Sequence, residues 1–194
     1  MTEMSPRFDE ALVYASDIHR KQRRKGSGSP YIAHLLGVAA LALEAGADED
    51  QAIAALLHDA VEDQGGAHRL AGISRRFGQR VAGIVADCSD SQVEPKPAWR
   101  ARKETYVASL STKSRDSLLV SICDKIYNAE AIVSDFRVHD DNLWDRFTGA
   151  KEGTLWYYQA LSEAFDQHLP GPLAEKFARL VRDMRTPPQP SVQT

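Results

Sequence analysis

Four titratable side chains close a strongly apolar run in the segment AIAALLHDAVED, residues 52–63. They are His58, Asp59, Glu62 and Asp63. Helical neighbours lie three and four residues apart, so Glu62 would lie beside His58 and Asp59, and Asp63 beside Asp59. Charge is costly to bury without a partner. A divalent transition metal such as Mn²⁺ or Fe²⁺ is the simplest compensating partner for imidazole and carboxylate groups, and it would leave positions for water and substrate.

A second interpretation is that the charged residues simply end a helix and face solvent. The sequence contains another such pair, His139-Asp140, in the polar stretch VHDDN, which we interpret as a surface loop. The two pairs differ in context, because only His58 and Asp59 follow a buried apolar run. This difference favours the metal interpretation for the first pair.

Two more side chains are candidate ligands from distant segments. His34 lies off the strongest apolar stripe of its expected helix, although a histidine satisfied within the core is the ordinary alternative. Asp124 interrupts the apolar segment SLLVSICDKIYNAEAIV and therefore needs a partner. Lys125 is a poor candidate for that partner, since adjacent helical residues point in different directions.

The elements that must position these residues are all predicted to be helices, because apolar residues recur at three and four residue steps and no alternating strand is present. The first helix carries Phe8 to Gln22 on one face, with His19 and Gln22 pointing inward. Glycine and proline break the chain at 26–30. The other expected helices run from near Tyr31 to about Gly46, from a cap at Asp48 or Asp50 to Gly65, and over 67–77, 79–88, 99–111, 116–136, about 150–168 and 172–184. We therefore predict an all-α, single-domain helical bundle over residues 1–185, with a loop at 90–97 and a disordered tail at 186–194.

Composition narrows the class of protein. With 194 residues, 43% of them hydrophobic, the chain suits one soluble domain. No apolar run approaches the roughly 20 residues of a membrane span, so we expect a cytoplasmic protein without a membrane partner. The two cysteines form no CxxC pair, and the net charge of -3 gives no reason to expect nucleic acid binding. The run HRKQRRK at 19–25 concentrates five cations, which suit either a phosphate group or a solvated helix end.

Taken as a set, these residues resemble the HD superfamily, and within it the hydrolase domain of the RelA/SpoT alarmone enzymes and the stand-alone small alarmone hydrolases. The resemblance covers about two-thirds of the chain, in family order. It is carried by His19-x-x-Gln22-Arg23-Arg24-Lys25, Pro30-Tyr31-Ile32-Ala33-His34, Leu56-Leu57-His58-Asp59-x-x-Glu62-Asp63, Phe77-Gly78 and Asp124-Lys125-Ile126-Tyr127-Asn128.

The resemblance implies an all-α fold and a site for one metal ion, most often manganese, with Fe²⁺ or Zn²⁺ as alternatives. The ligands it implies are His34, His58, Asp59 and Asp124. Glu62 and Asp63 would then organise or activate the attacking water.

The resemblance also implies contacts to a nucleotide. Arg24, Lys25 and Asn128 match family positions beside the substrate. The segment TGAKEGTLWYYQAL resembles a family helix that carries a basic residue and a tyrosine near phosphate, which matches Lys151 and Tyr158. An exposed lysine and a half-buried aromatic are the alternative for that pair. Arg102 and Lys103 could also face the pocket, which the sequence does not decide.

The activity implied is hydrolysis of the 3′-pyrophosphate of guanosine tetraphosphate or pentaphosphate (ppGpp or pppGpp) by a metal-activated water. One alternative is an HD phosphohydrolase that acts on another nucleotide, including NADPH. A second alternative is a nucleotide-binding sensor without turnover. The presence of every expected ligand and of both acidic groups argues against the sensor.

Overall fold

The computed structural model describes residues 3–90 and 97–186, and helices make up its regular structure. The only β-type pairing in these ranges is an isolated bridge between Arg23 and Pro30. The elements are α1 (Pro6–Ile18), α2 (Ile32–Glu44), α3 (Glu49–Leu57), α4 (Ala60–Asp63), α5 (Gly66–Phe77), α6 (Gln79–Cys88), α7 (Trp99–Ser109), η1 (Leu110–Thr112), α8 (Arg115–His139), η2 (Asp140–Arg146), α9 (Ala150–His168) and α10 (Pro172–Arg185).

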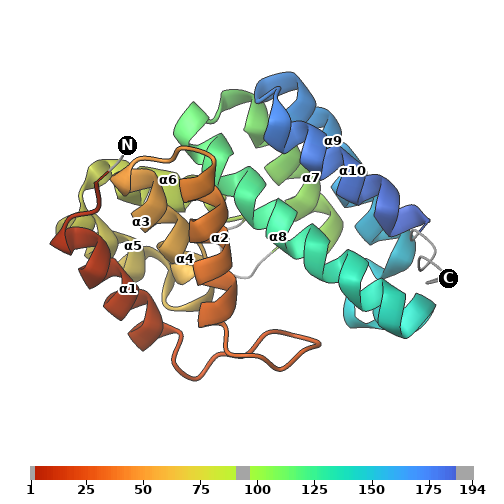
Figure 1. Ribbon diagram of the computed structural model, residues 1–194, viewed down its shortest axis with the longest axis horizontal. Helices are drawn as coiled ribbons and strands as arrows, with labels where there is room; N and C mark the ends of the chain where they lie inside the picture. Colours follow the sequence, from red (N-terminus) through yellow and green to blue (C-terminus); the bar gives the residue numbers. More distant parts are fainter. Residues whose placement is uncertain (1–2, 91–96, 187–194) are drawn as a thin grey trace, which may run out of the picture.

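The long helix α8 runs through the middle of the molecule and joins its two halves (Figure 1). On one side, α2, α3 and α6 pack against α8, with α1 and α5 behind them. On the other side, α10 packs along α8 and α9 packs on α10, while α7 contacts α9. A residue in the middle of α8 can therefore meet side chains from both halves.

Buried apolar side chains form one continuous cluster, which extends from Ala11 in α1 to Met184 in α10. The cluster includes both halves and most of the inner surface of α8, from Leu118 to Phe136. Burial of this kind of surface is the main favourable contribution to folding. The prediction of an all-α fold is confirmed.

Side-chain caps explain where the two helices that matter most to the site begin. Asp48 accepts a hydrogen bond from the amide of Gln51, whose side chain accepts one from the amide of Asp48, so a capping box starts α3. Ser114 accepts from the amide of Ser117 at the start of α8. Of the two caps expected for the third helix, Asp48 is the one used.

Two predictions of helix extent were wrong. The first helix ends at Ile18, so His19 caps its C-terminus and Gln22 lies in the following turn. The expected third helix is two helices, α3 and α4, joined at His58-Asp59. The Nδ1 atom of His58 lies 2.8 Å from the carbonyl oxygen of Ala55, the acceptor that the amide of Asp59 would use in an uninterrupted helix.

The remaining predictions on loops have mixed outcomes. His139 and Asp140 are exposed, as expected, but they lie in the last turn of α8 and in η2 rather than in a loop. The predicted loop at 90–97 and the predicted tail at 186–194 fall almost entirely outside the described residues. Within the part of the chain that is described, no helix is long and apolar enough to cross a membrane.

The helices α2 and α8 approach closely at Gly37. A Cβ atom on Gly37 would lie 2.0 Å from Cε2 of Tyr127, which is far inside contact distance. Gly37 is one turn after His34, and Tyr127 is one turn after Asp124. The absence of a side chain at Gly37 therefore allows the helix that carries His34 to approach the helix that carries Asp124.

We predict that Gly37→Ala destabilises the protein by about 1–3 kcal/mol, the usual cost of overpacking a filled contact. Gly83→Ala in α6 is the matched control, because a Cβ there meets nothing within 4 Å and the site is exposed. Alanine restricts the unfolded chain, so the control should be neutral or gain about 0.4–1 kcal/mol. Chemical denaturation of both variants measures the difference, and equal stabilities would refute the close-packing argument.

A candidate metal site between the two halves

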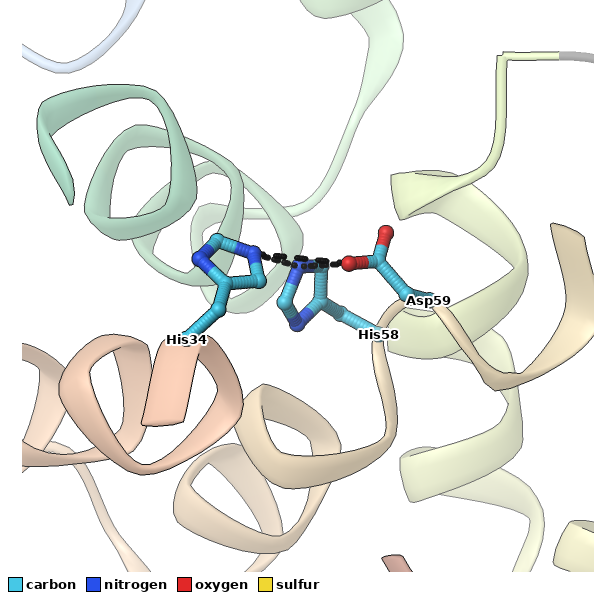
Figure 2. A group of neighbouring side chains, drawn as sticks. All are labelled: His34, His58 and Asp59. Carbon is cyan, nitrogen blue, oxygen red and sulfur yellow. Dashed lines mark hydrogen bonds and ion pairs between the residues drawn. The ribbon is translucent and has the colours of Figure 1, made fainter. Parts of the chain in front are cut away.

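Nitrogen and oxygen atoms of four side chains converge between α2, the α3–α4 joint and α8. His34 Nε2 lies 3.3 Å from His58 Nε2, 3.4 Å from Asp59 Oδ2 and 3.3 Å from Asp124 Oδ1. His58 Nε2 lies 3.0 Å from Asp59 Oδ2 and 3.5 Å from Asp124 Oδ1. Figure 2 shows the two imidazoles and Asp59 facing one another. The four candidate ligands that the sequence indicated are thus neighbours.

Each of the four residues reaches this point from a defined position in its helix. His34 lies in the first turn of α2, directly after the loop that Pro30 ends. His58 and Asp59 occupy the joint between α3 and α4, where the chain turns the aspartate toward the histidine. Asp124 lies near the middle of α8 and is the carboxylate that the long helix contributes.

The surroundings favour positive charge within this cluster. His58 is 2% exposed, and its burial acts to lower the pKa of the imidazole. The neighbouring carboxylates of Asp59 and Asp124 outweigh this effect and raise the pKa of His58 well above its usual value. Because Nδ1 of His58 donates to Ala55, the Nε2 atom is the one that faces the carboxylates.

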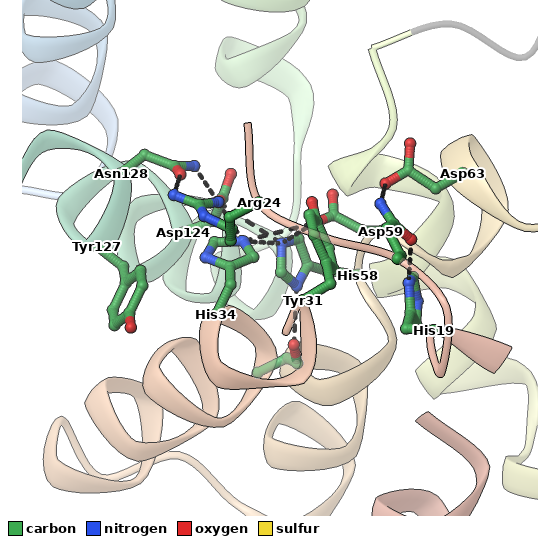
Figure 3. A network of polar contacts seen from close by, with 12 residues as sticks. His19, Arg24, Tyr31, His34, His58, Asp59, Asp63, Asp124, Tyr127 and Asn128 are labelled. Atoms are coloured by element: carbon green, nitrogen blue, oxygen red, sulfur yellow. Dashed lines mark hydrogen bonds and ion pairs between the residues drawn. The ribbon is translucent and has the colours of Figure 1, made fainter. Parts of the chain in front are cut away.

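The two carboxylates are held by further hydrogen bonds. The Tyr31 hydroxyl donates to Asp59 Oδ2 at 2.6 Å, and Asn128 Nδ2 donates to Asp124 Oδ1 at 2.6 Å (Figure 3). Burial alone would raise the pKa of both aspartates, but the imidazole of His58 holds Asp59 well below its usual pKa. The ammonium group of Lys125 contributes most to the same lowering for the pKa of Asp124.

The expectation that Lys125 is a poor partner for Asp124 was wrong. Its Nζ atom donates to Asp124 Oδ2 at 2.6 Å. The four-carbon side chain folds back along α8, which overcomes the different directions of two adjacent Cα–Cβ bonds. Lys125 is itself largely buried, with a side chain 15% exposed.

The arrangement fits one divalent ion. Ligand atoms about 2.1 Å from one ion and at right angles to one another lie roughly 3 Å apart. This is close to the 3.0–3.5 Å that separate the imidazole nitrogens from each other and from the carboxylate oxygens. Two imidazole nitrogens and two carboxylates are a donor set that first-row transition metals accept. His34, His58 and Asp59 meet the geometry of a metal-binding group, and Asp124 Oδ1 lies 3.3 Å from His34 Nε2 on the side of α8. Positive charge at this point would offset the repulsion between the carboxylates.

Glu62 and Asp63, the residues expected to act on water, lie beyond the joint in α4. Glu62 is half-buried, and its charge acts on Lys103 in α7. Asp63 is exposed, and its Oδ2 atom accepts from Gln22 Nε2 at 2.7 Å. Gln22 is held in turn by the buried His19, whose Nδ1 lies 2.6 Å from Gln22 Oε1. His19 is buried as expected, Gln22 is half-buried, and together they hold the side chain of Asp63.

A cavity of about 290 Å³ adjoins the cluster on the side of α7 and α9. It is lined by Lys25, Trp99, Lys103, Lys125, Asn128, Asp135, Leu143, Arg146, Phe147, Thr148, Gly149, Thr154, Tyr157 and Tyr158. Four cationic side chains and four large aromatic side chains of this wall suit a phosphorylated ligand with a ring system.

Only some of the residues expected to contact a nucleotide line this cavity. Lys25, Asn128 and Tyr158 line it. Arg24 lies next to it, because its Nη2 atom donates to Asn128 Oδ1 at 2.9 Å. Lys151 instead pairs with Asp141 at 2.6 Å and is not among the lining residues within the described chain.

The sequence interpretation overlooked three residues that hold the site together. Tyr31 orients Asp59, Lys125 neutralises Asp124, and Trp99 forms part of the cavity wall. Tyr31 and Lys125 lie within the motifs that carried the resemblance, next to expected ligands or one helical turn away. That adjacency was the available signal, whereas nothing in the sequence marked Trp99.

The chain is similar to known proteins with an HD domain. The model of the HD domain family matches residues 11–153. A relative from Xenopus tropicalis, guanosine-3′,5′-bis(diphosphate) 3′-pyrophosphohydrolase MESH1, is 38% identical over 122 residues, which are 61% of this chain. The match spans 65% of that relative's length. The MESH1 protein of Drosophila melanogaster is 33% identical over 146 residues, 74% of this chain and 76% of the relative.

A solved structure supports the same grouping. The chain superposes with a TM-score of 0.77 on a metazoan orthologue of SpoT that is described as hydrolysing ppGpp. The two are 27% identical, and the superposition covers 94% of this chain and 98% of the other. The similarity therefore includes α7, α9 and α10 as well as the helices that carry the ligand cluster.

We predict that the affinity of the site for a divalent ion rises with pH. The raised pKa of His58 means that its imidazole holds a proton at neutral pH in the metal-free protein, and an ion must displace that proton to bind Nε2. Below the pKa, affinity should increase about tenfold per pH unit for each proton released. Titration with Mn²⁺ between pH 6 and pH 8 measures this slope, and affinity independent of pH would contradict the assignment of His58.

Proposed function

The chain belongs to the HD domain family, and from this premise we propose that it is a metal-dependent hydrolase that removes the 3′-pyrophosphate of guanosine tetraphosphate or pentaphosphate. The observation that carries the proposal is the position of the four-residue cluster beside a cavity lined with lysines. The names of the MESH1 relatives and the description of the SpoT orthologue support this substrate.

His34, His58, Asp59 and Asp124 would hold the metal, and we propose Mn²⁺ because mixed imidazole and carboxylate donors suit it. When bound, such an ion supplies the Lewis acidity that makes water nucleophilic near neutral pH. Tyr31 and Asn128 keep the two carboxylates oriented through their hydrogen bonds. Residues that orient metal ligands in this way matter for binding, and mutation of such a residue typically lowers metal affinity or activity about 10- to 100-fold.

Glu62 and Asp63 are the proposed proton acceptors. In the hydrolysis, oxygen of water forms a bond to phosphorus, the bond from phosphorus to the ribose 3′ oxygen breaks, and pyrophosphate leaves. The attacking water loses a proton, and the ribose oxygen gains one. Gln22 fixes the direction of the Asp63 carboxylate, while the charge of Glu62 acts on Lys103.

Lys25, Asn128 and Tyr158 are the proposed nucleotide contacts within the cavity, and Arg24 supports Asn128 from its rim. A planar guanidinium can also stack on a base. In the present structure the Cζ atom of Arg24 lies over the aromatic ring of Tyr31, 6.0 Å from the ring centroid. Lys151 would have to leave its ion pair with Asp141 to join them.

Incubation of the purified protein with guanosine tetraphosphate and Mn²⁺ tests the proposed reaction. We expect GDP and pyrophosphate in equal amounts, because the bond to the 3′ oxygen is the one that breaks. NADPH and a nucleoside monophosphate serve as comparison substrates. Release of orthophosphate alone, or equal rates on all three compounds, would refute the proposed bond and substrate.

We predict that Glu62→Gln lowers turnover about 10²- to 10⁴-fold, the usual contribution of a general base. The metal content should stay unchanged, since Glu62 is not among the proposed ligands. The matched control is Glu175→Gln, the same change at an exposed position of α10. Atomic absorption and product assays separate the two effects, and full activity of Glu62→Gln would remove Glu62 from the mechanism.

A further inference from the structure

Two largely buried lysines, Lys103 and Lys125, line the cavity that adjoins the ligand cluster. Lys125 Nζ lies 2.6 Å from Asp124, and Lys103 Nζ lies 2.7 Å from Asp90. Their side chains are 15% and 19% exposed, and both residues line the cavity. Burial lowers the pKa of Lys103, and the positive charge of Lys125 lowers it further. Each ammonium group has one carboxylate partner, yet the two positive charges still act on each other, and a further anion in the cavity would reduce that repulsion.

Two hydroxyl groups of α9 lie in the same wall without a protein partner. Thr154 and Tyr157 are 3% and 6% exposed, and both line the cavity. Neither Thr154 Oγ1 nor Tyr157 Oη has a hydrogen-bond partner among the described residues. Three residues apart, they lie on the same face of α9. Buried hydroxyls are nearly always satisfied, so two in one wall indicate that a ligand completes them.

Trp99 packs α7, which carries Lys103, against α9, which carries the two hydroxyl groups. Its indole lies on the backbone of Gly149 and Gly153 at the start of α9, where a Cβ atom on Gly149 would lie 2.5 Å from the ring. The Trp99 and Tyr157 ring centroids are 6.3 Å apart. Lys103 Nζ lies 4.9 Å from the Tyr157 ring centroid, one helical turn beyond Trp99. The two glycines thus allow α7 to bring Lys103 over α9.

We infer that Lys103, Lys125, Thr154 and Tyr157 form a subsite for a pyrophosphate group. The inference rests on the proposed function and locates the group that is removed. Two ammonium groups and two hydroxyls can all donate hydrogen bonds, which suits phosphate oxygens because these only accept. A guanine base also carries N–H donors, and an ammonium group cannot accept hydrogen bonds from them. Because Lys125 contacts Asp124, an anion bound here lies next to the ligand cluster.

Binding of inorganic pyrophosphate to the Mn²⁺-loaded protein tests the subsite without requiring catalysis. We expect Lys103→Gln to weaken pyrophosphate binding about 10- to 100-fold, the loss expected for a charge-assisted contact. Asp90 keeps its partner in this variant, because Arg102 Nη1 lies 2.6 Å from both of its oxygens. Lys176→Gln is the matched control, since it removes an ion-paired lysine of α10 outside the cavity and should leave binding unchanged.

Tyr157→Phe and Thr154→Val supply a readout that a purely structural role would not produce. Each removes a buried hydroxyl without a protein partner, so thermal stability should be unchanged or higher while pyrophosphate binding weakens about threefold to tenfold. GDP binding should change in none of the variants. Wild-type affinity for pyrophosphate in Lys103→Gln and Tyr157→Phe, or no binding by the unmodified protein, would overturn the subsite.

The two failures are distinguishable. If the variants lose pyrophosphate binding but guanosine tetraphosphate is not hydrolysed, the subsite stands and the proposed substrate is wrong. If guanosine tetraphosphate is hydrolysed while the variants bind pyrophosphate as the unmodified protein does, the reaction stands and the subsite is wrong.

Discussion

Two carboxylates in the interior, each with an oxygen within 3.5 Å of two neighbouring imidazoles, require positive charge between or beside them. The remainder of the site is arranged around this requirement. Lys125 neutralises one carboxylate from the side, while Tyr31 and Asn128 donate hydrogen bonds that keep both carboxylates in place. A metal ion at the centre would satisfy the same requirement.

This constraint extends to the backbone. The four side chains come from three places in the chain, and they meet only because α2 and α8 approach at Gly37 and because the helix breaks after Leu57. The break releases His58 and Asp59 from strict helical spacing, so that two adjacent residues can face one point. Core packing around α8 therefore does more than stabilise the fold, since it sets the separation of the ligand atoms.

The charges of the site are divided between two adjoining regions. The ligand cluster carries the carboxylates, and the cavity next to it carries lysines from α7 and α8 together with hydroxyls from α9. A substrate with several phosphates can bridge the two regions, because it offers anionic oxygens to the ion and to the lysines at once. The α7–α9 contact at Trp99 matters for this reason, although Trp99 itself lies outside every motif that suggested the function.

The sequence by itself determined the helical fold and most helix boundaries, because apolar periodicity and capping act locally. It also indicated the four residues of the cluster, because a charge inside an apolar run needs a partner and because the motifs resemble those of a known family. Tertiary structure alone decided which cations reach the cavity. Lys103 lies in its wall and Lys151 does not, and Lys125 turns back onto Asp124 against the expectation from helix geometry. Long flexible side chains have many directions open to them, and packing between distant segments selects one.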